Sequence, residues 1–463
     1  MKRTLCALTF LSCVSLTRAD DWPGWRGPTG QGTSAEKDLP LKWDRTTNVR
    51  WKVALPAPGN STPIVWGDRV FLTQASDLKQ WPPKVPANYA GGASPGGRAI
   101  AEKRSVLCFR RSDGKLLWQG DTIYKEPEMT HPTNPFCSAS PVTDGERVIA
   151  SHGSAGVVCY DFEGKRLWHH DVGKLKHLWG NASSPILYGD LCIQWCGPGE
   201  RQFLRAVNKH TGKKVWETAE AGGDTGITSR KFLGSWCTPI IARVAPSPQP
   251  LSPRGRGEQS GPLSPRGRGG EKRGQEQLIF AVPFKLAGYD PKTGKELWSA
   301  KVPGTYCYSS PLYVEGLAIY GSSLTKLGGS GDITKDQLRY RVGSMYIGTA
   351  VIAGEYLYTV NNVGVPSCYE WKTGQELWKD QIEKRPGVGD SWGSLVHVGG
   401  RIYLTDQRGD TVVLAAGRKY EHLATNRLDE HTNASIAVSG GDLFIRTHKH
   451  LWCIGQKKEP KEK

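Results

Sequence analysis

Short apolar runs separated by glycine-containing turns recur along most of the chain. Residues 309–320 are typical: Ser-Ser-Pro precedes Leu-Tyr-Val, a Glu-Gly pair follows, and Leu-Ala-Ile-Tyr comes next. Two short apolar segments on either side of a Gly turn are the pattern of a β-hairpin. We therefore predict the first two strands of a repeated unit at each copy. The copies begin at Ser61, Ser138, Ser183, Cys237, Ser309, Thr349, Gly393 and Ala434.

A second pattern alternates with the first and ends in tryptophan. Its clearest copy, residues 289–298, reads Tyr-Asp-Pro-Lys-Thr-Gly-Lys-Glu-Leu-Trp. The glycine adopts the positive φ that the turn requires, and the Trp follows on the outgoing strand. A large indole at the same place in each unit can wedge between neighbouring sheets. The tryptophans that we assign to this docking role are Trp51, Trp118, Trp168, Trp216, Trp298 and Trp378.

Together the two patterns predict an all-β fold, an eight-bladed β-propeller with four-stranded antiparallel blades. Residues 20–455 form this single domain. In two modules the Trp is replaced, by Tyr340 and by Leu423. Helices are expected to be nearly absent, because no long stretch follows a helical period.

The two ends of the repeat region are incomplete in a complementary way. The C-terminal strands 443–447 and 451–454 lack a final Trp strand, whereas residues 49–53 form a Trp strand without a preceding hairpin. We expect these segments to complete one blade, with Trp51 and Trp452 in a shared sheet. Such closure protects sheet edges that would otherwise pair with other chains.

Two insertions interrupt the repeat. Residues 244–276 contain the octet Pro-Leu-Ser-Pro-Arg-Gly-Arg-Gly twice, and we predict a disordered, low-complexity insertion there. It is either a tolerated translated repeat or a basic interaction arm. Residues 74–105 are a second insertion, between the second and third strands of the first blade. The tail 456–463 is also predicted to be disordered.

The N-terminus has the pattern of a signal peptide. Lys2 and Arg3 precede an apolar stretch at 5–16, and cleavage is expected after Ala19, so residues 1–19 are the signal segment. The other reading is an uncleaved anchor. We expect an exported protein, in the periplasm or outside the cell. No later segment is long and apolar enough to predict a membrane span.

The charge and the cysteines add little chemistry. The net charge is +17, but the basic residues form no stripe with interleaved aromatics, so no nucleic-acid partner is expected. Cysteines recur at two repeat positions, which predicts small buried side chains rather than a metal site. Cys192 and Cys196, placed on a strand and the following loop, are too far apart for a disulfide, and other pairings stay open. The recurring cysteines are Cys108, Cys159, Cys368 and Cys453 at one position and Cys137, Cys237 and Cys307 at the other.

Polar and aromatic residues precede several of the inner strands, which crowd the central axis. They lie on the face that carries the longest loops, 121–137, 169–181 and 217–236. We predict a funnel for a protein, peptide, glycan or small ligand; the alternative is that these side chains only pack the loops. The candidates are His131, Asn134, Cys137, His177, Trp179, Asn181, Trp236, Tyr306 and Trp392.

The Tyr-Asp-x-x-Thr-Gly-Lys-x-Leu-Trp units resemble the repeats of pyrroloquinoline-quinone (PQQ)-dependent alcohol dehydrogenases and of the propeller lipoprotein of the outer-membrane assembly machinery. The opening 21–28, Asp-Trp-Pro-Gly-Trp-Arg-Gly-Pro, and the ending 432–454 resemble exported PQQ-like repeat proteins of planctomycete-type bacteria. The resemblance implies the propeller fold but not a function, since PQQ-like propellers include members that bind no quinone.

The sequence offers no catalytic set. The quinoprotein enzymes that it resembles have a Ca²⁺ site, an aspartate base and adjacent cysteines, and no adjacent Cys-Cys or carboxylate set is recognisable here. We therefore predict a non-catalytic binding or assembly scaffold at the cell envelope, with no cofactor and no metal. The alternatives are a PQQ- and Ca²⁺-dependent alcohol or sugar dehydrogenase and a carbohydrate-binding propeller. The oligomeric state is not predicted.

Overall fold

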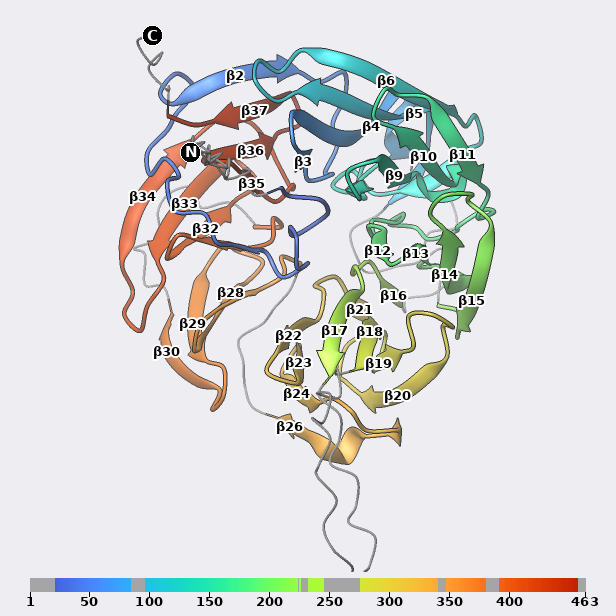
Figure 1. Cartoon of the computed structure of the whole chain (residues 1–463), viewed down its shortest axis with the longest axis vertical. Helices are drawn as coiled ribbons and strands as arrows, with labels where there is room; N and C mark the ends of the chain where they lie inside the picture. Colours follow the sequence, from blue (N-terminus) through green and yellow to red (C-terminus); the bar gives the residue numbers. More distant parts are fainter. Residues whose placement is uncertain are drawn as a thin grey trace, which may run out of the picture.

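The computed structural model describes residues 21–84, 96–223, 225, 232–244, 275–339, 347–379 and 391–456. These residues form an all-β structure in which sheets are arranged around a central axis, as in a β-propeller (Figure 1). The only helices in the described ranges are two short 3₁₀ turns, at Gly153–Ala155 and Thr334–Asp336. The signal segment 1–19, Tyr340 and the predicted disordered tail from 457 onward lie outside the described residues.

Eight sheets in this part of the chain contain four or more strands, and the blade number itself stays a prediction. From the inner to the outer strand, the first four are β3 (Ile64–Trp66), β4 (Arg69–Lys84), β5 (Gly97–Arg110) and β6 (Leu116–Ile123); β8 (Val142–Thr143), β9 (Arg147–Ser151), β10 (Val157–Asp161) and β11 (Arg166–His170); β12 (Ile186–Tyr188), β13 (Leu191–Cys196), β14 (Gln202–Asn208) and β15 (Lys214–Glu220); and β17 (Ile240–Val244), β18 (Gln275–Val282), β19 (Lys285–Tyr289) and β20 (Glu296–Lys301).

The remaining four sheets continue the same antiparallel order. They are β22 (Leu312–Val314), β23 (Leu317–Tyr320), β24 (Ser323–Lys326) and β26 (Gln337–Arg339); β27 (Val351–Ala353), β28 (Tyr356–Val360), β29 (Pro366–Glu370) and β30 (Gln375–Lys379); β31 (Val396–Val398), β32 (Arg401–Thr405), β33 (Asp410–Ala415) and β34 (His422–Arg427); and β35 (Ala437–Ser439), β36 (Asp442–Arg446), β37 (His450–Ile454) and β2 (Val49–Ala54). Short additional strands are β1 (Thr33–Ser34), β7 (Glu128–Thr130), β16 (Gly234–Ser235), β21 (Tyr306–Cys307) and β25 (Gly331–Asp332).

The last sheet contains both ends of the repeat region. Strand β2 pairs antiparallel with β37, and Trp51 lies opposite Cys453 while Lys52 lies opposite Trp452. The prediction that the two termini share a sheet is confirmed. Leu423, the predicted Trp replacement, lies on β34 and packs against the core cluster that includes this sheet.

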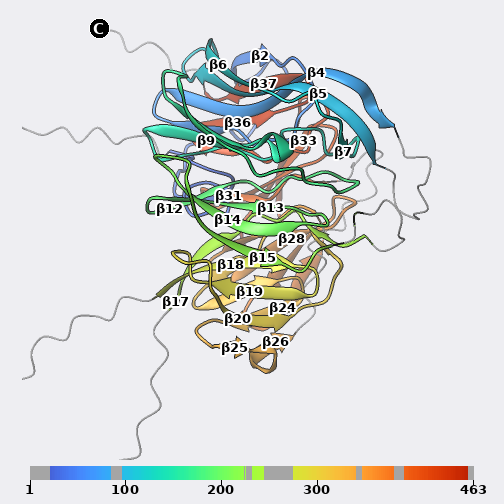
Figure 2. The same ribbon diagram turned by 90° about the vertical axis from the view of Figure 1, so that its right-hand side faces the viewer.

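Several expected boundaries were wrong. Val244, Gln275 and Glu276 are strand residues, because β17 and β18 continue to pair up to Val244 and Gln275. Residues 245–274 of the predicted insertion lie outside the described residues. The insertion at 74–105 is largely strand, because β4 and β5 extend as one long hairpin (Figure 2). Cys196 is also on a strand, β13, rather than in the loop after it.

Four docking tryptophans bridge neighbouring sheets in the same way. The indole N–H of Trp168, for example, donates to the backbone carbonyl of Lys209 in the next hairpin, at 2.9 Å. The corresponding bonds join Trp51 to Arg111, Trp118 to Phe162 and Trp216 to Pro291, at 2.8, 2.8 and 3.1 Å. Each contact ties the outer strand of one sheet to the turn of the next. Trp378 makes a longer contact, 3.5 Å, with the carbonyl of Gly417.

Trp298 does not dock in this way, which corrects its assignment. Its indole N–H donates to Gln277 Oε1 of its own sheet at 2.8 Å, and the side chain is fully buried. The next sheet has no Thr-Gly-Lys hairpin at the matching place. Instead the connection between β24 and β26 folds back, and β25 pairs in parallel with β20 beside Trp298.

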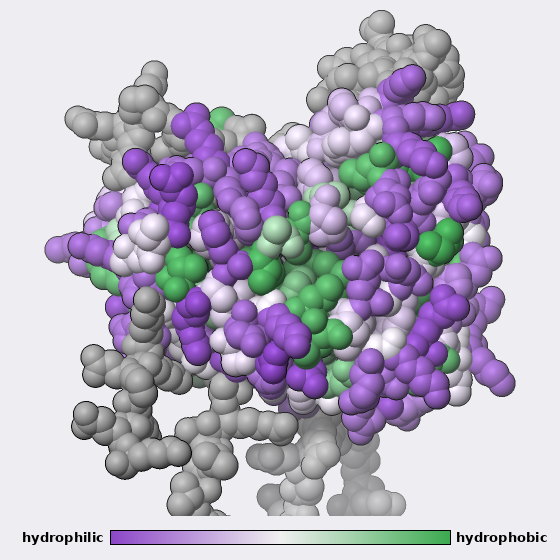
Figure 3. Space-filling view, turned by 90° about the horizontal axis from the view of Figure 1, so that it is seen from above, coloured by the Kyte–Doolittle hydropathy of each residue, from purple (hydrophilic) through white to green (hydrophobic). Residues whose placement is uncertain are grey.

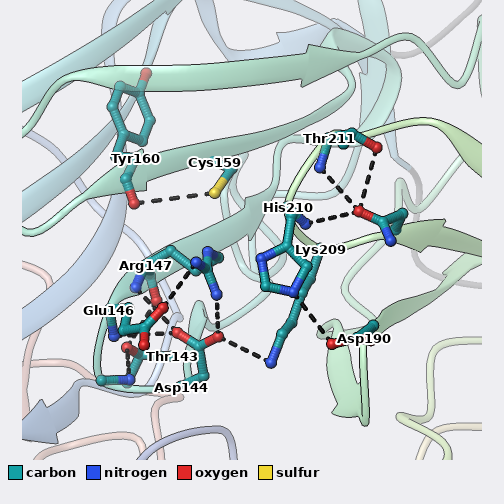
Figure 4. Close-up of polar contacts among 12 residues, drawn as sticks. Thr143, Asp144, Glu146, Arg147, Cys159, Tyr160, Asp190, Lys209, His210 and Thr211 are labelled. Atoms are coloured by element: carbon teal, nitrogen blue, oxygen red, sulfur yellow. Dashed lines mark hydrogen bonds and ion pairs between the residues drawn. The ribbon is translucent and has the colours of Figure 1, made fainter.

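Charged side chains reinforce one of these junctions. Asp144, at the turn after β8, contacts Arg147 Nη1 at 2.6 Å and Lys209 Nζ of the next sheet at 3.1 Å (Figure 4). The carbonyl of the same Lys209 accepts the Trp168 indole bond. The hairpin is therefore held by its backbone and by its side chain.

Candidate functional site

A ring of hydroxyl groups encircles the axis. In every one of the eight larger sheets, the residue two positions before the inner strand is Ser or Thr. The hydroxyl oxygen of each accepts a hydrogen bond from the backbone N–H of its counterpart in the preceding sheet, over 2.8–3.2 Å. The eighth bond, from Ser435 to Thr62, closes the circle. The ring residues are Thr62, Ser140, Ser184, Thr238, Ser310, Thr349, Ser394 and Ser435.

The N-terminal segment crosses the channel on the far side of this ring. Trp22 exchanges two backbone bonds with Val65 of β3, and the carbonyl of Pro23 accepts from Thr143 of β8. Farther along, Gly32 accepts from His397, and β1 pairs in parallel with β31. These partners lie in the first, second and seventh sheets, so the segment passes across the axis, as the dark-blue trace in Figure 1 shows.

Arg26 fixes the middle of this segment. Its buried guanidinium donates to four backbone carbonyls, those of Gln31, Thr349, Ala350 and Leu395, at 2.6–3.3 Å. Burial lowers the pKa of Arg26 to about 9, so it keeps its charge at neutral pH. Its neighbour Trp25 lines the central cavity.

The cavity has a volume of about 490 Å³, within the range of small-molecule sites. It extends from Trp25 and the hydroxyl ring to the loops that precede the inner strands. Six of the nine predicted site residues line it: His131, Asn134, Trp179, Trp236, Tyr306 and Trp392.

Three predicted residues do not line the cavity, which corrects the expectation for Cys137, His177 and Asn181. Cys137 is buried beneath the β4–β5 hairpin, and burial raises the pKa of its thiol to about 12, so it is a poor nucleophile. His177 is buried and packs edge-on against Trp236, with ring centroids 4.9 Å apart. Asn181 presents its backbone carbonyl to the Asn134 side chain at 3.4 Å.

One side of the cavity is aromatic. Trp236 and Tyr308 stack with ring centroids 5.1 Å apart, and Tyr306 stacks on Tyr308 at 5.7 Å. Trp179 contacts Trp236 at 5.7 Å and is backed by Phe232, stacked at 4.7 Å. The Trp236 indole also donates to the carbonyl of Gly180 at 2.9 Å, which fixes its plane. We call Trp179, Trp236, Tyr306 and Tyr308, with Phe232 behind Trp179, the aromatic wall.

The facing side is polar and held by its own hydrogen bonds. The amides of Asn60 and Asn433 both donate to the carbonyl of Thr133, at 2.9 and 3.1 Å. The Asn134 amide donates to the carbonyl of Trp179 at 2.7 Å and so joins the two sides. Asn60, Thr133, Asn134 and Asn433, with His131, form the polar wall.

His131 is neutral in this setting. Its Nδ1 accepts the backbone N–H of Thr133 at 3.2 Å, and burial lowers the pKa of the ring to about 4. None of the described lining residues is Lys, Arg, Asp or Glu. The cavity surface contributed by these residues is therefore uncharged at neutral pH.

Sequence reasoning missed Trp25 and the ring of Ser and Thr hydroxyl groups as parts of the site. The pre-proline positions Thr62, Ser140, Ser184, Thr238 and Ser310 were visible as a motif, but the bonds among them join residues tens of positions apart. Trp25 stood out only as part of a shared N-terminal motif. Asn60, Thr133, Tyr308 and Asn433 carried no local signal that distinguishes them from loop residues.

A family model described as outer membrane protein assembly factor BamB matches residues 33–180, 76–230 and 200–459. The chain belongs to this PQQ-like repeat family. Within the wider propeller group, the quinohemoprotein alcohol dehydrogenase ADHIIG from Pseudomonas putida HK5 is 10% identical, with a TM-score of 0.57 over 96% of this chain and 82% of that one. A europium-containing methanol dehydrogenase is 10% identical, with a TM-score of 0.59 over 92% of this chain and 89% of that one. These likenesses show the fold alone.

Among curated proteins, the tetrathionate hydrolase of Acidithiobacillus ferrooxidans is 24% identical over 396 residues. The match covers 78% of this chain and 66% of that protein, so it spans slightly less than two thirds of the relative. In the part of the PQQ-like chain that the structure describes, no helix is long and apolar enough to cross a bilayer.

Proposed function

We propose that this PQQ-like propeller is a non-catalytic binding or assembly scaffold at the cell envelope, with the central cavity as its ligand site. The observation that carries the proposal is the cavity itself, in which an aromatic wall faces a polar wall and the described lining is uncharged. Preformed, largely apolar pockets with a few fixed polar groups are typical binding sites. The family description, an assembly factor, supports a binding role over a catalytic one.

Export is part of the same proposal. Residues 1–19 have the features of a signal peptide, and cleavage after Ala19 would leave Asp20 first, just ahead of the segment that crosses the channel. Mass spectrometry of the protein recovered from the periplasm or medium is expected to give a mature chain starting at Asp20. An intact Met1 on the exported protein would contradict cleavage.

The quinoprotein alternative fits the site poorly. PQQ carries three carboxylates, yet the described lining supplies no Lys or Arg to bind them. Calcium takes six to eight oxygen ligands with carboxylates among them, and no group of three or more His, Cys, Asp or Glu able to hold a metal occurs among the described residues. Tetrathionate is a dianion and meets the same obstacle.

Intrinsic fluorescence tests the proposal, because Trp25, Trp179, Trp236 and Trp392 all line the cavity. The probes are neutral oligosaccharides, uncharged peptides, PQQ with CaCl₂, and tetrathionate. We expect a saturable change with an uncharged probe, and neither binding nor turnover with PQQ or tetrathionate. Stoichiometric PQQ binding with alcohol oxidation would overturn the proposal, as would silence from every uncharged probe.

A further inference from the structure

The cavity is closed at one end by the protein's own N-terminal segment. Trp25 lines it, and Arg26 immediately afterwards donates to the backbone carbonyls of Ala350 and Leu395, which directly precede β27 and β31. The backbone bonds of Trp22 and Pro23 fix the start of the segment to β3 and β8 of two neighbouring sheets, and the bond from His397 to Gly32 fixes its end to β31. A molecule that enters by the loop face therefore meets an indole and cannot thread through the channel.

The two walls together match a sugar ring. One face of a pyranose carries C–H groups that pack on an aromatic plane, and its hydroxyls extend at the edge, where amides and hydroxyls can pair with them. Here the stacked rings of Trp236 and Tyr308 supply the plane. Asn60 and Asn433 stand on the other side, and the ring hydroxyls of Thr62, Ser184, Thr238, Ser394 and Ser435 line the cavity near Trp25.

The hydroxyl ring adds donors that the described part of the protein does not use. Each of the eight Ser and Thr hydroxyl oxygens accepts a hydrogen bond from a backbone N–H. Within the described part of the chain, no hydrogen bond donated by these eight O–H groups is found. The five that line the cavity can each donate to a ligand oxygen. A ligand rich in neutral oxygens satisfies these donors without introducing charge into the site.

We propose that the cavity is a blind pocket that binds the terminal unit of an uncharged glycan, with Trp25 as its floor. This inference rests on the proposed binding function and adds the ligand class and the direction of entry. Arg26 is a positioning residue, because it holds the backbone that presents Trp25 but does not line the cavity.

Titration calorimetry of the full mature chain tests the ligand class. The probes are linear oligomers of glucose, mannose, xylose, galactose and N-acetylglucosamine, with uronic-acid and sulfated oligosaccharides and uncharged peptides as competing classes. We expect binding by at least one neutral oligomer. Binding by uncharged peptides alone overturns the glycan proposal while the binding function stands, whereas binding by charged oligosaccharides alone overturns both. No response from any probe overturns both.

Stoichiometry tests the entry by the end. The number of protein molecules bound per oligomer is measured for oligomers of increasing length of the sugar that binds. We expect this number to stay constant, with one protein for each chain end that fits the pocket. A number of bound proteins that rises with chain length would show binding along the chain and would overturn the blind pocket. The same titration reads the affinity of each variant.

Substitutions test the residues. Trp25→Ala and Trp236→Ala are each expected to weaken binding about tenfold or more, because each removes a large contact surface from the ligand. Trp66→Ala is the matched control, since Trp66 is half-buried on β3 and does not line the cavity. Unchanged affinity in Trp25→Ala, with the melting temperature preserved, would remove Trp25 from the site. Trp25→Phe keeps an aromatic floor and is expected to retain most of the affinity.

Discussion

One buried cation, Arg446, joins the last sheet to the first. The guanidinium of Arg446 on β36 donates to Ser61 Oγ at 2.5 Å, to the carbonyl of Thr73 at 2.7 Å and to Gln74 Oε1 at 2.8 Å. Burial lowers the pKa of Arg446 to about 9, which still leaves it charged at neutral pH. A buried charge is tolerated only when its hydrogen bonds are made, so the space around this group is tightly constrained.

Gly59 provides that space. A side chain there would overlap the Arg446 guanidinium, so Gly59→Ala must displace a buried charge from its acceptors. We expect a loss of about 3 kcal/mol in the free energy of unfolding, measured by denaturant titration. Gly417→Ala is the control, because nothing lies within 4 Å of the added carbon there. An equal effect of the two substitutions would exclude this role for Arg446.

His152 makes stability depend on pH in a definite direction. Burial, with the nearby charges of Arg104 and His169, lowers its pKa from 6.5 to about 3. The unfolded chain therefore binds a proton at this group that the folded chain does not bind between pH 6.5 and about 3, so stability falls as the pH drops through that window. We expect His152→Gln to give a shallower decline in melting temperature between pH 6.5 and 4. A decline as steep as in the unchanged protein would contradict this role.

At the scale of the element, tryptophan and glycine act as a pair. A Cβ added at Gly212 would lie only 2.7 Å from the nearest atom of the Trp168 indole, and one added at Gly114 or Gly164 would crowd Trp51 or Trp118 in the same way. Each of these glycines also has a positive φ. The turn therefore needs glycine twice, once for its backbone and once because the preceding sheet's indole lies against it.

Two substitutions separate the parts of this contact. Trp168→Phe keeps an aromatic ring but loses the bond to Lys209, and we expect a cost of about 1 kcal/mol. Trp168→Ala removes the ring, with an expected cost of about 3–5 kcal/mol. The measurement is denaturant unfolding, with the exposed Leu116→Ala on β6 as a neutral control. Equal losses for Phe and Ala would show that the bond, not the packing, dominates.

The sequence predicted what is local and missed what is not. The Thr-Gly-Lys hairpins and the Ser-x-Pro strands are encoded within a few residues, so their positions and the partner strands at 49–53 and 451–454 could be predicted. The hydroxyl ring is built from bonds between residues such as Ser435 and Thr62, which no local pattern connects. Trp298 failed as a docking residue for the same reason, because its behaviour depends on the next hairpin.

At the scale of the whole molecule, closure depends on three contacts that involve the last sheet. The first is the β2–β37 ladder, which lies within the last sheet and joins the two ends of the repeat region; the Ser435–Thr62 bond and the Arg446 network then connect this sheet to the first. The outer rim carries limited apolar patches among hydrophilic residues over the side with β2 and β6 (Figure 3), where Leu116, Leu117 and Ile123 are exposed. Because the circle of sheets is closed, the first and last sheets pack against each other and neither lacks a neighbour.

Deleting residues 449–463 removes β37 and leaves β2 without its partner, so both the edge of β36 and the flank of the first sheet become exposed. We expect this truncated chain to lose cooperative unfolding and to aggregate on gel filtration, since each sheet buries its faces only against its neighbours. Deleting 457–463 alone keeps the complete ladder from His450 to Ile454 and is expected to leave the melting temperature unchanged. If the chain lacking 449–463 stayed soluble with an unchanged melting temperature, pairing of β2 with β37 would not be what stabilises the closed circle. The hydroxyl ring and Arg446 would then have to hold it alone.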